Sequence, residues 1–211
     1  MRILVVGASG RTGRALVEQA LERGHEVTAL VRDASRLELT HPRLSVRVGS
    51  LADRVALEDA VRGQEAVVSA LGVGRPLRPD PAVVDGVRAL VEAMRRVGVG
   101  RLVYLSFVGV RESRSQAGPL IRHVLSRLVR HEVADHEEKE AIIRGSDRLW
   151  TIVRPPKLTS GRRRGGVWAG EAIRSGWLLP RVSRADVASF MLDQLTDTTF
   201  QRKAPSLFPA G

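Results

Sequence analysis

The sequence predicts an α/β protein built on a doubly wound parallel sheet. Through the first 155 residues, apolar runs of strand length alternate with segments of helical period, and apolar strands of this kind are typical of a parallel sheet with helices on both faces. A glycine-rich turn follows the first apolar run directly, as it does where a strand leads into a nucleotide-binding helix. The 211 residues suffice for one such domain. We therefore expect a single Rossmann-like domain, with a nucleotide-binding core over 1–155 and a short irregular substrate cover with a C-terminal helix over 156–211.

The expected elements follow in chain order. Strands are predicted at 2–6, 26–31, 44–48, 66–70, 101–106 and 149–154. The clearest helices are predicted at 11–23 and 83–97, because apolar residues recur there at helical spacing. Gly24 and Gly98 follow them, at the position where a helix end favours a residue that tolerates positive φ. The segment 119–144 is also expected to be helical.

The end of the chain is less regular. The proline pair 155–156 ends the last expected strand, and residues 157–182 are rich in Gly, Arg and Trp without a clear period. Ser183 is expected to cap a final helix over 185–195, with Asp186 at the capping-box position.

Composition and charge exclude several classes of protein. The chain carries 34 Lys and Arg against 23 Asp and Glu, a net charge of +11 that is concentrated after residue 100. A strongly basic protein is a candidate for nucleic-acid binding. However, aromatic residues make up only 4% of the chain, and we find no stacking platform or recognition motif, so we do not expect nucleic acid as the partner. The absence of cysteine excludes disulfides, thiolate metal sites and a thiol nucleophile.

The sequence contains no membrane signal. No stretch approaches the ~18 apolar residues of a membrane span, and we find no signal peptide. We expect a cytoplasmic protein without a membrane partner, either a monomer or a homodimer. The positive charge of the second half would suit an anionic small-molecule substrate.

The turn GASGRTG at 7–13 predicts a site for the pyrophosphate of a dinucleotide. Glycines permit a tight turn and a close approach of the backbone, and the N–H groups at the start of the following helix attract an anion. The spacing is GxxGxxG, the form common among short-chain dehydrogenases. The alternative is a merely structural glycine turn, which the position between a strand and an amphipathic helix disfavours.

The end of the second strand favours NADP(H) over NAD(H). An NAD site has Asp or Glu there to accept a hydrogen bond from the ribose 2′-hydroxyl, whereas this chain has Arg32, followed by Arg36. Two guanidinium groups can hold a 2′-phosphate that a carboxylate would repel. Two alternatives remain: both are ordinary surface arginines, or Asp33 reaches the ribose from one residue further on.

These motifs together resemble a known family. GASGRTG, LVRDASRL, VVSALG, DHEEKEAIIRGS and WTIVRPPKL are similar to the atypical (NmrA-like) short-chain dehydrogenase/reductase group of NAD(P)H-binding proteins. Within that group the chain is most similar to the NADPH-dependent flavin reductase/biliverdin reductase B type. The resemblance covers roughly residues 1–160, and beyond them only SRADVASFML resembles the C-terminal helix of the family.

The resemblance implies a set of cofactor contacts. It places Ser9, Gly10, Arg11 and Thr12 on the phosphates in a turn shaped by Gly7 and Gly13, Arg32 and Arg36 on the 2′-phosphate, Ser50 and Leu51 at the adenine, Ala70, Leu71 and Gly72 beside the ribose and nicotinamide, and Pro155 at the carboxamide. The family usually has Gly-Asp-Val where this chain has Gly-Ser-Leu at 49–51. Ser50 can still bond the adenine amine, but it carries no charge.

The usual catalytic acid of short-chain dehydrogenases is absent. Their Tyr-x-x-x-Lys motif has no counterpart, because Val108 stands four residues after Tyr104, the single tyrosine, and Asp135 stands four residues before Lys139. A reaction at a simple carbonyl would therefore lose about 10² to 10⁴ in rate. A conjugated acceptor relaxes this requirement, because it spreads the charge of the hydride and can take its proton from water.

Ser106 and His136 are the catalytic candidates. Ser106 closes the fifth strand and is expected to offer a hydroxyl near the nicotinamide. It could equally be a simple strand end, since the hydroxyl of the family maps one residue later, onto Phe107. His136 matches the active-site histidine of the family and could donate or relay a proton. The alternative for His136 is a solvated face of a highly charged helix.

Two further features concern the substrate side. We expect no metal site, although His131, Glu132, Asp135 and His136 have helical spacing, because a second element offers no ligand. Trp168 and Trp177 flank the expected cover and could stack on a planar acceptor, although core packing is the usual role of tryptophan.

The sequence therefore favours an NADPH-dependent reductase that transfers hydride to a conjugated acceptor, such as a flavin, a quinone or a tetrapyrrole-like compound. The alternative is a non-catalytic NADP(H)-binding redox sensor, regulator or assembly factor, which the missing catalytic acid would suit.

Overall fold

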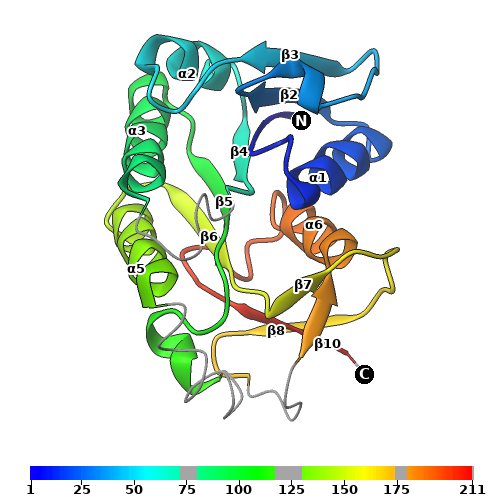
Figure 1. Cartoon of the computed structure of the whole chain (residues 1–211), viewed down its shortest axis with the longest axis vertical. Helices are drawn as coiled ribbons and strands as arrows, with labels where there is room; N and C mark the ends of the chain where they lie inside the picture. The colour runs from blue at the N-terminus through cyan, green and yellow to red at the C-terminus, as the bar shows by residue number, and fades with distance from the viewer. Residues whose placement is uncertain (72–79, 117–129, 174–179, 211) are drawn as a thin grey trace.

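The computed structural model describes residues 1–71, 80–116, 130–173 and 180–210. Its centre is a parallel sheet of six strands in the order β3-β2-β1-β4-β5-β6 (Figure 1). The strands are β1 Arg2–Val6, β2 Glu26–Val31, β3 Leu44–Val48, β4 Ala66–Ser69, β5 Arg101–Leu105 and β6 Leu149–Val153. All six strands predicted from the sequence are present, and the last three end one residue earlier than expected. The predicted doubly wound, Rossmann-like α/β fold is confirmed.

Helices cover both faces of this sheet. They are α1 Arg11–Glu22, α2 Arg54–Val61, α3 Pro81–Val97, α5 Arg130–Arg144 and α6 Arg184–Asp193, with 3₁₀ turns η1 Ala34–Arg36 and η2 Arg111–Ser115. Figure 1 shows α1 and α6 on one side of the sheet and α2, α3 and α5 on the other. The helix predicted at 119–144 is observed over Arg130–Arg144, and 117–129 lie outside the described residues.

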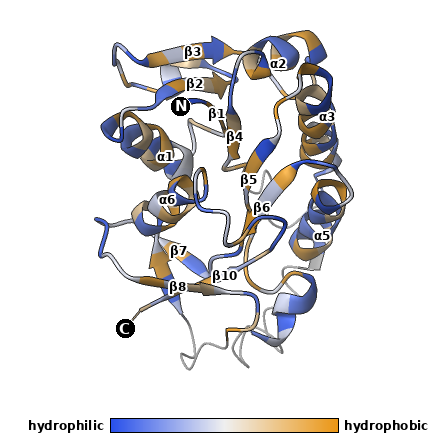
Figure 2. Cartoon of the chain, turned by 180° about the vertical axis from the view of Figure 1, so that it is seen from behind, coloured by the Kyte–Doolittle hydropathy of each residue, from blue (hydrophilic) through white to orange (hydrophobic). Residues whose placement is uncertain are grey.

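The alternation of side chains along each strand divides the core into two layers. Ile3 and Val5 of β1 belong to the cluster that contains the buried faces of α1 and α6. Leu4 and Val6, their neighbours in sequence, belong to the cluster under α2, α3 and α5. Figure 2 shows the hydrophobic residues along the central strands. Strands that bury both faces have no polar side, which is why they appear in the sequence as continuous apolar runs.

Local signals explain where several helices begin and end. Asp53 accepts hydrogen bonds from the N–H groups of Val55 and Ala56 at the start of α2. Gly98 follows α3 with φ +79°, a left-handed conformation that glycine adopts without strain. Ser183 caps α6 by accepting from the N–H of Asp186 at 3.0 Å, as predicted.

The expectation of an irregular C-terminal cover is wrong. The cover contains four short strands, β7 Lys157–Thr159, β8 Val167–Gly170, β9 Arg181–Ser183 and β10 Ser206–Pro209. β7 pairs in parallel with β9, and β8 pairs antiparallel with β10. Strands of three or four residues are too short to show alternation, and their partners lie far away in the sequence, so no local pattern reveals them.

The end of the chain attaches this cover to the main sheet. Arg154 donates its N–H to the carbonyl of Pro205 at 2.9 Å, and Leu207 donates to the carbonyl of Arg154 at 2.9 Å. The segment therefore runs beside β6 before it pairs with β8. Within the part of the chain that the structure describes, no helix has the length and apolar character needed to cross a membrane.

Candidate functional site

The glycine turn between β1 and α1 has a geometry that only glycine permits. Gly7 has φ +80°, and a Cβ atom there would lie 2.7 Å from the carbonyl oxygen of Ala70. A Cβ atom on Gly13 would lie 2.0 Å from the carbonyl oxygen of Gly7. Gly10 donates its N–H to that same carbonyl at 3.0 Å, which closes the turn. The two outer glycines therefore bring β1, β4 and α1 into close backbone contact.

The start of α1 is suited to an anion. Gly10 is the N-cap and offers no side chain, and the first turn holds no acidic residue. The N–H groups at this end therefore have no side-chain acceptor of the usual capping kind. Arg11 is exposed, Ser9 is half-buried and Thr12 is buried at the same turn. The four residues predicted to bind phosphate, 9–12, therefore all lie at the start of α1.

Arg32 and Arg36 are both exposed where the chain leaves β2. Asp33, between them, accepts hydrogen bonds from the N–H and the hydroxyl of Ser35 at 3.0 and 2.8 Å. These hydrogen bonds lower the pKa of Asp33. The carboxylate is therefore engaged in its own turn, while both guanidinium groups lie on the surface.

The residues predicted to face the adenine and ribose lie at the ends of β3 and β4. Ser50 accepts a hydrogen bond from the N–H of Ala52 at 3.1 Å, and Leu51 packs against α3 where Gly86 has no side chain. Ala70 is buried and Leu71 is half-buried beside the glycine turn. Gly72 lies outside the described residues.

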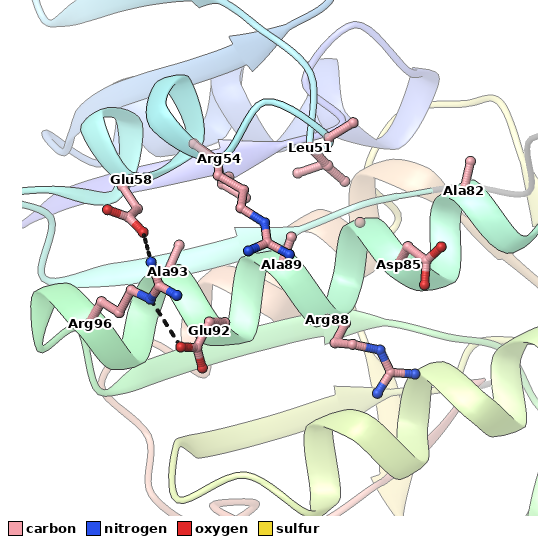
Figure 3. A pocket seen from close by; sticks show the side chains of 13 residues that line it. Leu51, Arg54, Glu58, Ala82, Asp85, Arg88, Ala89, Glu92, Ala93 and Arg96 are labelled. Carbon is pink, nitrogen blue, oxygen red and sulfur yellow. Dashed lines mark hydrogen bonds and ion pairs between the residues drawn. The ribbon is translucent and has the colours of Figure 1, made fainter.

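A groove of about 680 Å³ between α2 and α3 was not predicted from the sequence (Figure 3). Leu51 lines it, together with small residues of both helices such as Ala89. Arg96 bridges the helices, with contacts of 3.0 Å to both Glu58 and Glu92. Because its residues come from two helices far apart in sequence, no single motif marks it.

The two catalytic candidates lie side by side. The hydroxyl oxygen of Ser106, directly after β5, is 3.3 Å from Nδ1 of His136 on α5. Both are buried, His136 with only 4% of its surface exposed, and the ring of Phe107 meets the imidazole edge to face at 4.8 Å. The alternative of a solvated helix face for His136 is therefore wrong, because α5 turns this residue toward the sheet.

Sequence reasoning missed the two charged residues beside this pair. Glu140 lies one turn after His136 on α5 and accepts a hydrogen bond from the hydroxyl of Ser106 at 2.7 Å. Arg154, at the end of β6, donates to both oxygens of Glu140 at 2.9 and 2.5 Å. Glu140 is fully buried and Arg154 is 1% exposed. The available signal was the spacing of Glu140 from His136, which places both on one face of a helix.

Burial controls protonation in this region. The pKa of His136 is lowered well below its usual value, first by burial and then by the positive charge of Lys139. Burial also lowers the pKa of Lys139 and raises that of Tyr104. Tyr104 faces the layer under α3 and α5 and belongs to the core. At neutral pH the imidazole of His136 is therefore uncharged and the phenol of Tyr104 retains its proton.

The cover meets the sheet near these residues. Pro155 is buried, and its carbonyl accepts a hydrogen bond from the N–H of Val108 at 3.0 Å, which joins the loops after β5 and β6. Trp168 on β8 is 62% exposed, so core packing is not its role. Trp177 lies outside the described residues. In the described part of the chain, no cluster of three His, Asp or Glu side chains could hold a metal ion.

The strand order, the glycine turn and the open start of α1 define a dinucleotide-binding protein of the Rossmann class. The family profile for NAD(P)H-binding proteins matches residues 7–198, and the chain belongs to this family. The family predicted from the sequence motifs is confirmed, and so is its cofactor class, NAD(P)H.

Characterised relatives include two Streptomyces reductases. The chain is 31% identical over 209 residues to the (4-alkanoyl-5-oxo-2,5-dihydrofuran-3-yl)methyl phosphate reductase of Streptomyces griseus, covering 96% of this chain and 66% of the relative. It is 40% identical over 124 residues to a 3-diazoavenalumate denitrifying reductase of a Streptomyces species, covering 49% and 36%. The chain thus spans less than two thirds of either relative.

A solved structure supports the fold. A short-chain dehydrogenase/reductase of Veillonella parvula, determined in complex with NADP, superposes with a TM-score of 0.80 at 23% identity. The match covers 100% of this chain and 95% of the other. At 23% identity, this similarity supports the fold alone.

Proposed function

We propose that this protein is an NADPH-dependent reductase that transfers hydride to a conjugated, anionic small molecule. The observation that carries the proposal is the pair of exposed arginines, Arg32 and Arg36, beside a nucleotide turn, combined with a buried neutral histidine at the carboxyl end of the sheet. Bound NADPH supplies the hydride. The residues of the chain bind the cofactor and orient the acceptor.

The preference for NADPH rests on charge. Arg32 and Arg36 come from one strand end and the following 3₁₀ turn, where both can approach a single 2′-phosphate. Asp33 is held by Ser35 through two hydrogen bonds, which compete with a contact to the ribose. We also propose that Ser9, Arg11 and Thr12, at the glycine turn, contact the phosphates. The residues after β3 and β4 would contact the adenine and the ribose.

The proposal of a conjugated acceptor rests on the missing proton donor. Ser106 directs its proton to Glu140, and His136 is neutral. An acceptor that spreads charge over its own double bonds needs less help from an acid. The name of the Streptomyces griseus relative describes a compound with a ring double bond conjugated to two carbonyl groups and with a phosphate, so that compound is both conjugated and anionic.

A second candidate function is a non-catalytic NADP(H)-binding regulator. The missing proton donor also favours this function, because Tyr104 is a core residue with a raised pKa and cannot act as the usual catalytic acid. A regulator would bind NADPH without consuming it.

The experiment mixes the purified protein with NADPH and then with FMN, a quinone, a linear tetrapyrrole or an unsaturated lactone phosphate, and follows the nicotinamide absorbance. Oxidation with at least one acceptor supports the reductase, whereas binding without oxidation supports the regulator.

Arg32→Ala should weaken NADPH binding roughly ten- to hundredfold, the effect of one charge-assisted hydrogen-bonding group, and should leave NADH binding unchanged. Arg62→Ala removes an exposed charge directly after α2 and serves as the control. Equal losses for NADPH in both variants would contradict the assignment.

A further inference from the structure

A buried chain of hydrogen bonds leads to His136. It begins at Arg154, passes through the carboxylate of Glu140 and the hydroxyl of Ser106, and ends at Nδ1 of the imidazole. All four side chains are at most 5% exposed. They come from β6, α5 and the end of β5, so three packed elements fix their relative positions.

The chemistry of these groups allows one assignment of protons. Glu140 accepts from both Nε and Nη2 of Arg154, so it is a carboxylate that can only accept. Ser106 has one proton and lies 2.7 Å from that carboxylate, so it donates there. Its oxygen must then accept from His136 at 3.3 Å, which places a proton on Nδ1.

This assignment leaves Nε2 with a lone pair. A neutral imidazole has a single N–H group, and burial together with Lys139 keeps His136 neutral by lowering its pKa. In this state the histidine cannot donate a proton through Nε2. It can only accept a hydrogen bond there.

We propose that Glu140 and Arg154 are positioning residues that act through Ser106 to hold His136 as the Nδ1–H tautomer, so that Nε2 accepts a hydrogen bond from the substrate. This proposal rests on the proposed reductase function and narrows its substrate class. The acceptor carries an N–H or O–H group, as flavins and linear tetrapyrroles do, whereas a simple quinone has only carbonyl oxygens. The proton that joins the reduced acceptor comes from water, since Nε2 of His136 carries no proton and the Nδ1 proton is donated to Ser106.

The first test measures the tautomer without any substrate. The full-length chain, labelled with ¹⁵N at histidine, is studied by NMR at pH 7, where one-bond and two-bond couplings distinguish the two ring nitrogens. We expect the Nδ1–H form of His136 to exceed the other form about tenfold, as one hydrogen bond allows. In Ser106→Ala the population should shift toward Nε2–H, the form that a neutral imidazole prefers on its own.

A matched variant controls for the loss of a buried hydroxyl. Ser206 is also fully buried, and its hydroxyl has no hydrogen bond among the described residues. Ser206→Ala should leave the tautomer unchanged. A wild-type His136 that is mainly Nε2–H would overturn the proposal, and so would identical spectra for wild type and Ser106→Ala. The wild-type measurement decides even if a variant fails to fold.

The second test uses a pair of probes that differ in one donor. Oxidised lumiflavin has a single N–H group, and 3-methyllumiflavin has none. With NADPH, kcat/KM of the wild type should fall about tenfold on methylation, and His136→Leu should show little difference between the probes. Equal losses in both proteins would refute the hydrogen bond to Nε2. If no acceptor oxidises NADPH, the reductase proposal fails while the NMR result still decides the tautomer.

Discussion

The buried pair of Arg154 and Glu140 gives the sharpest prediction about stability. Arg154→Met removes two hydrogen bonds, of 2.9 and 2.5 Å, from the fully buried carboxylate of Glu140, and a third, of 2.9 Å, from Glu112. The hydroxyl of Ser106 remains, and Arg144 lies 3.7 Å from Glu140. Breaking a buried pair in this way costs about 3–5 kcal/mol. In a protein of this size each kcal/mol lowers Tm by roughly 2–4 °C, so we expect a decrease of roughly 6–20 °C.

The measurement is urea and thermal unfolding followed by circular dichroism at pH 7. An exposed pair provides the control, because Arg95 donates two hydrogen bonds to Glu92 in the same bidentate way, at 3.0 and 2.9 Å. Arg95→Met should cost much less than Arg154→Met, since solvent screens exposed pairs. The double variant Arg154→Met with Glu140→Leu should recover most of the loss, because apolar side chains can replace a buried pair. If Arg154→Met costs no more than Arg95→Met, the reasoning is refuted.

Three further predictions concern the turn, the acid range and the cover. Gly13→Ala should abolish NADPH binding in a titration and lower Tm, because its Cβ would lie 2.0 Å from a backbone oxygen, whereas Gly100→Ala, with no atom within 4 Å, should do neither. The pKa of Glu112 is about 2, since hydrogen bonds from Arg154 and Arg144 outweigh the opposing effect of burial. The charged carboxylate of Glu112 therefore adds to the free energy of unfolding above pH ~4.5, and this contribution is lost as the pH falls toward 2. The stability difference between wild type and Glu112→Gln should vanish over this range in acid titrations of unfolding. Ser183→Ala should cost about 1–2 kcal/mol in urea, because it removes the cap of α6, and an unchanged midpoint would contradict that role.

The fold was largely predictable because its signals are local. A strand buried on both faces appears in the sequence as an apolar run, as at β1. In a helix that packs on one side, apolar residues recur every three to four positions, as in α3. The spacing of the glycine turn is a local signal too, and a Cβ on Gly13 would meet the carbonyl oxygen of Gly7 within the same turn. The space at Gly7, in contrast, is limited by the backbone of Ala70, directly after β4. The C-terminal strands were missed because β8 and β10 pair across more than thirty residues.

The sequence by itself determined the class of the protein, through the spacing of its glycines, and it offered Ser106 and His136 as separate candidates. Only the tertiary structure decided that these two side chains meet, 3.3 Å apart and buried, although they are thirty residues apart in the sequence. It also brought Glu140 and Arg154 behind them, and burial gave the histidine its neutral state. Proton positions depend on distances of a few tenths of an ångström between packed elements, and a sequence pattern does not contain such distances.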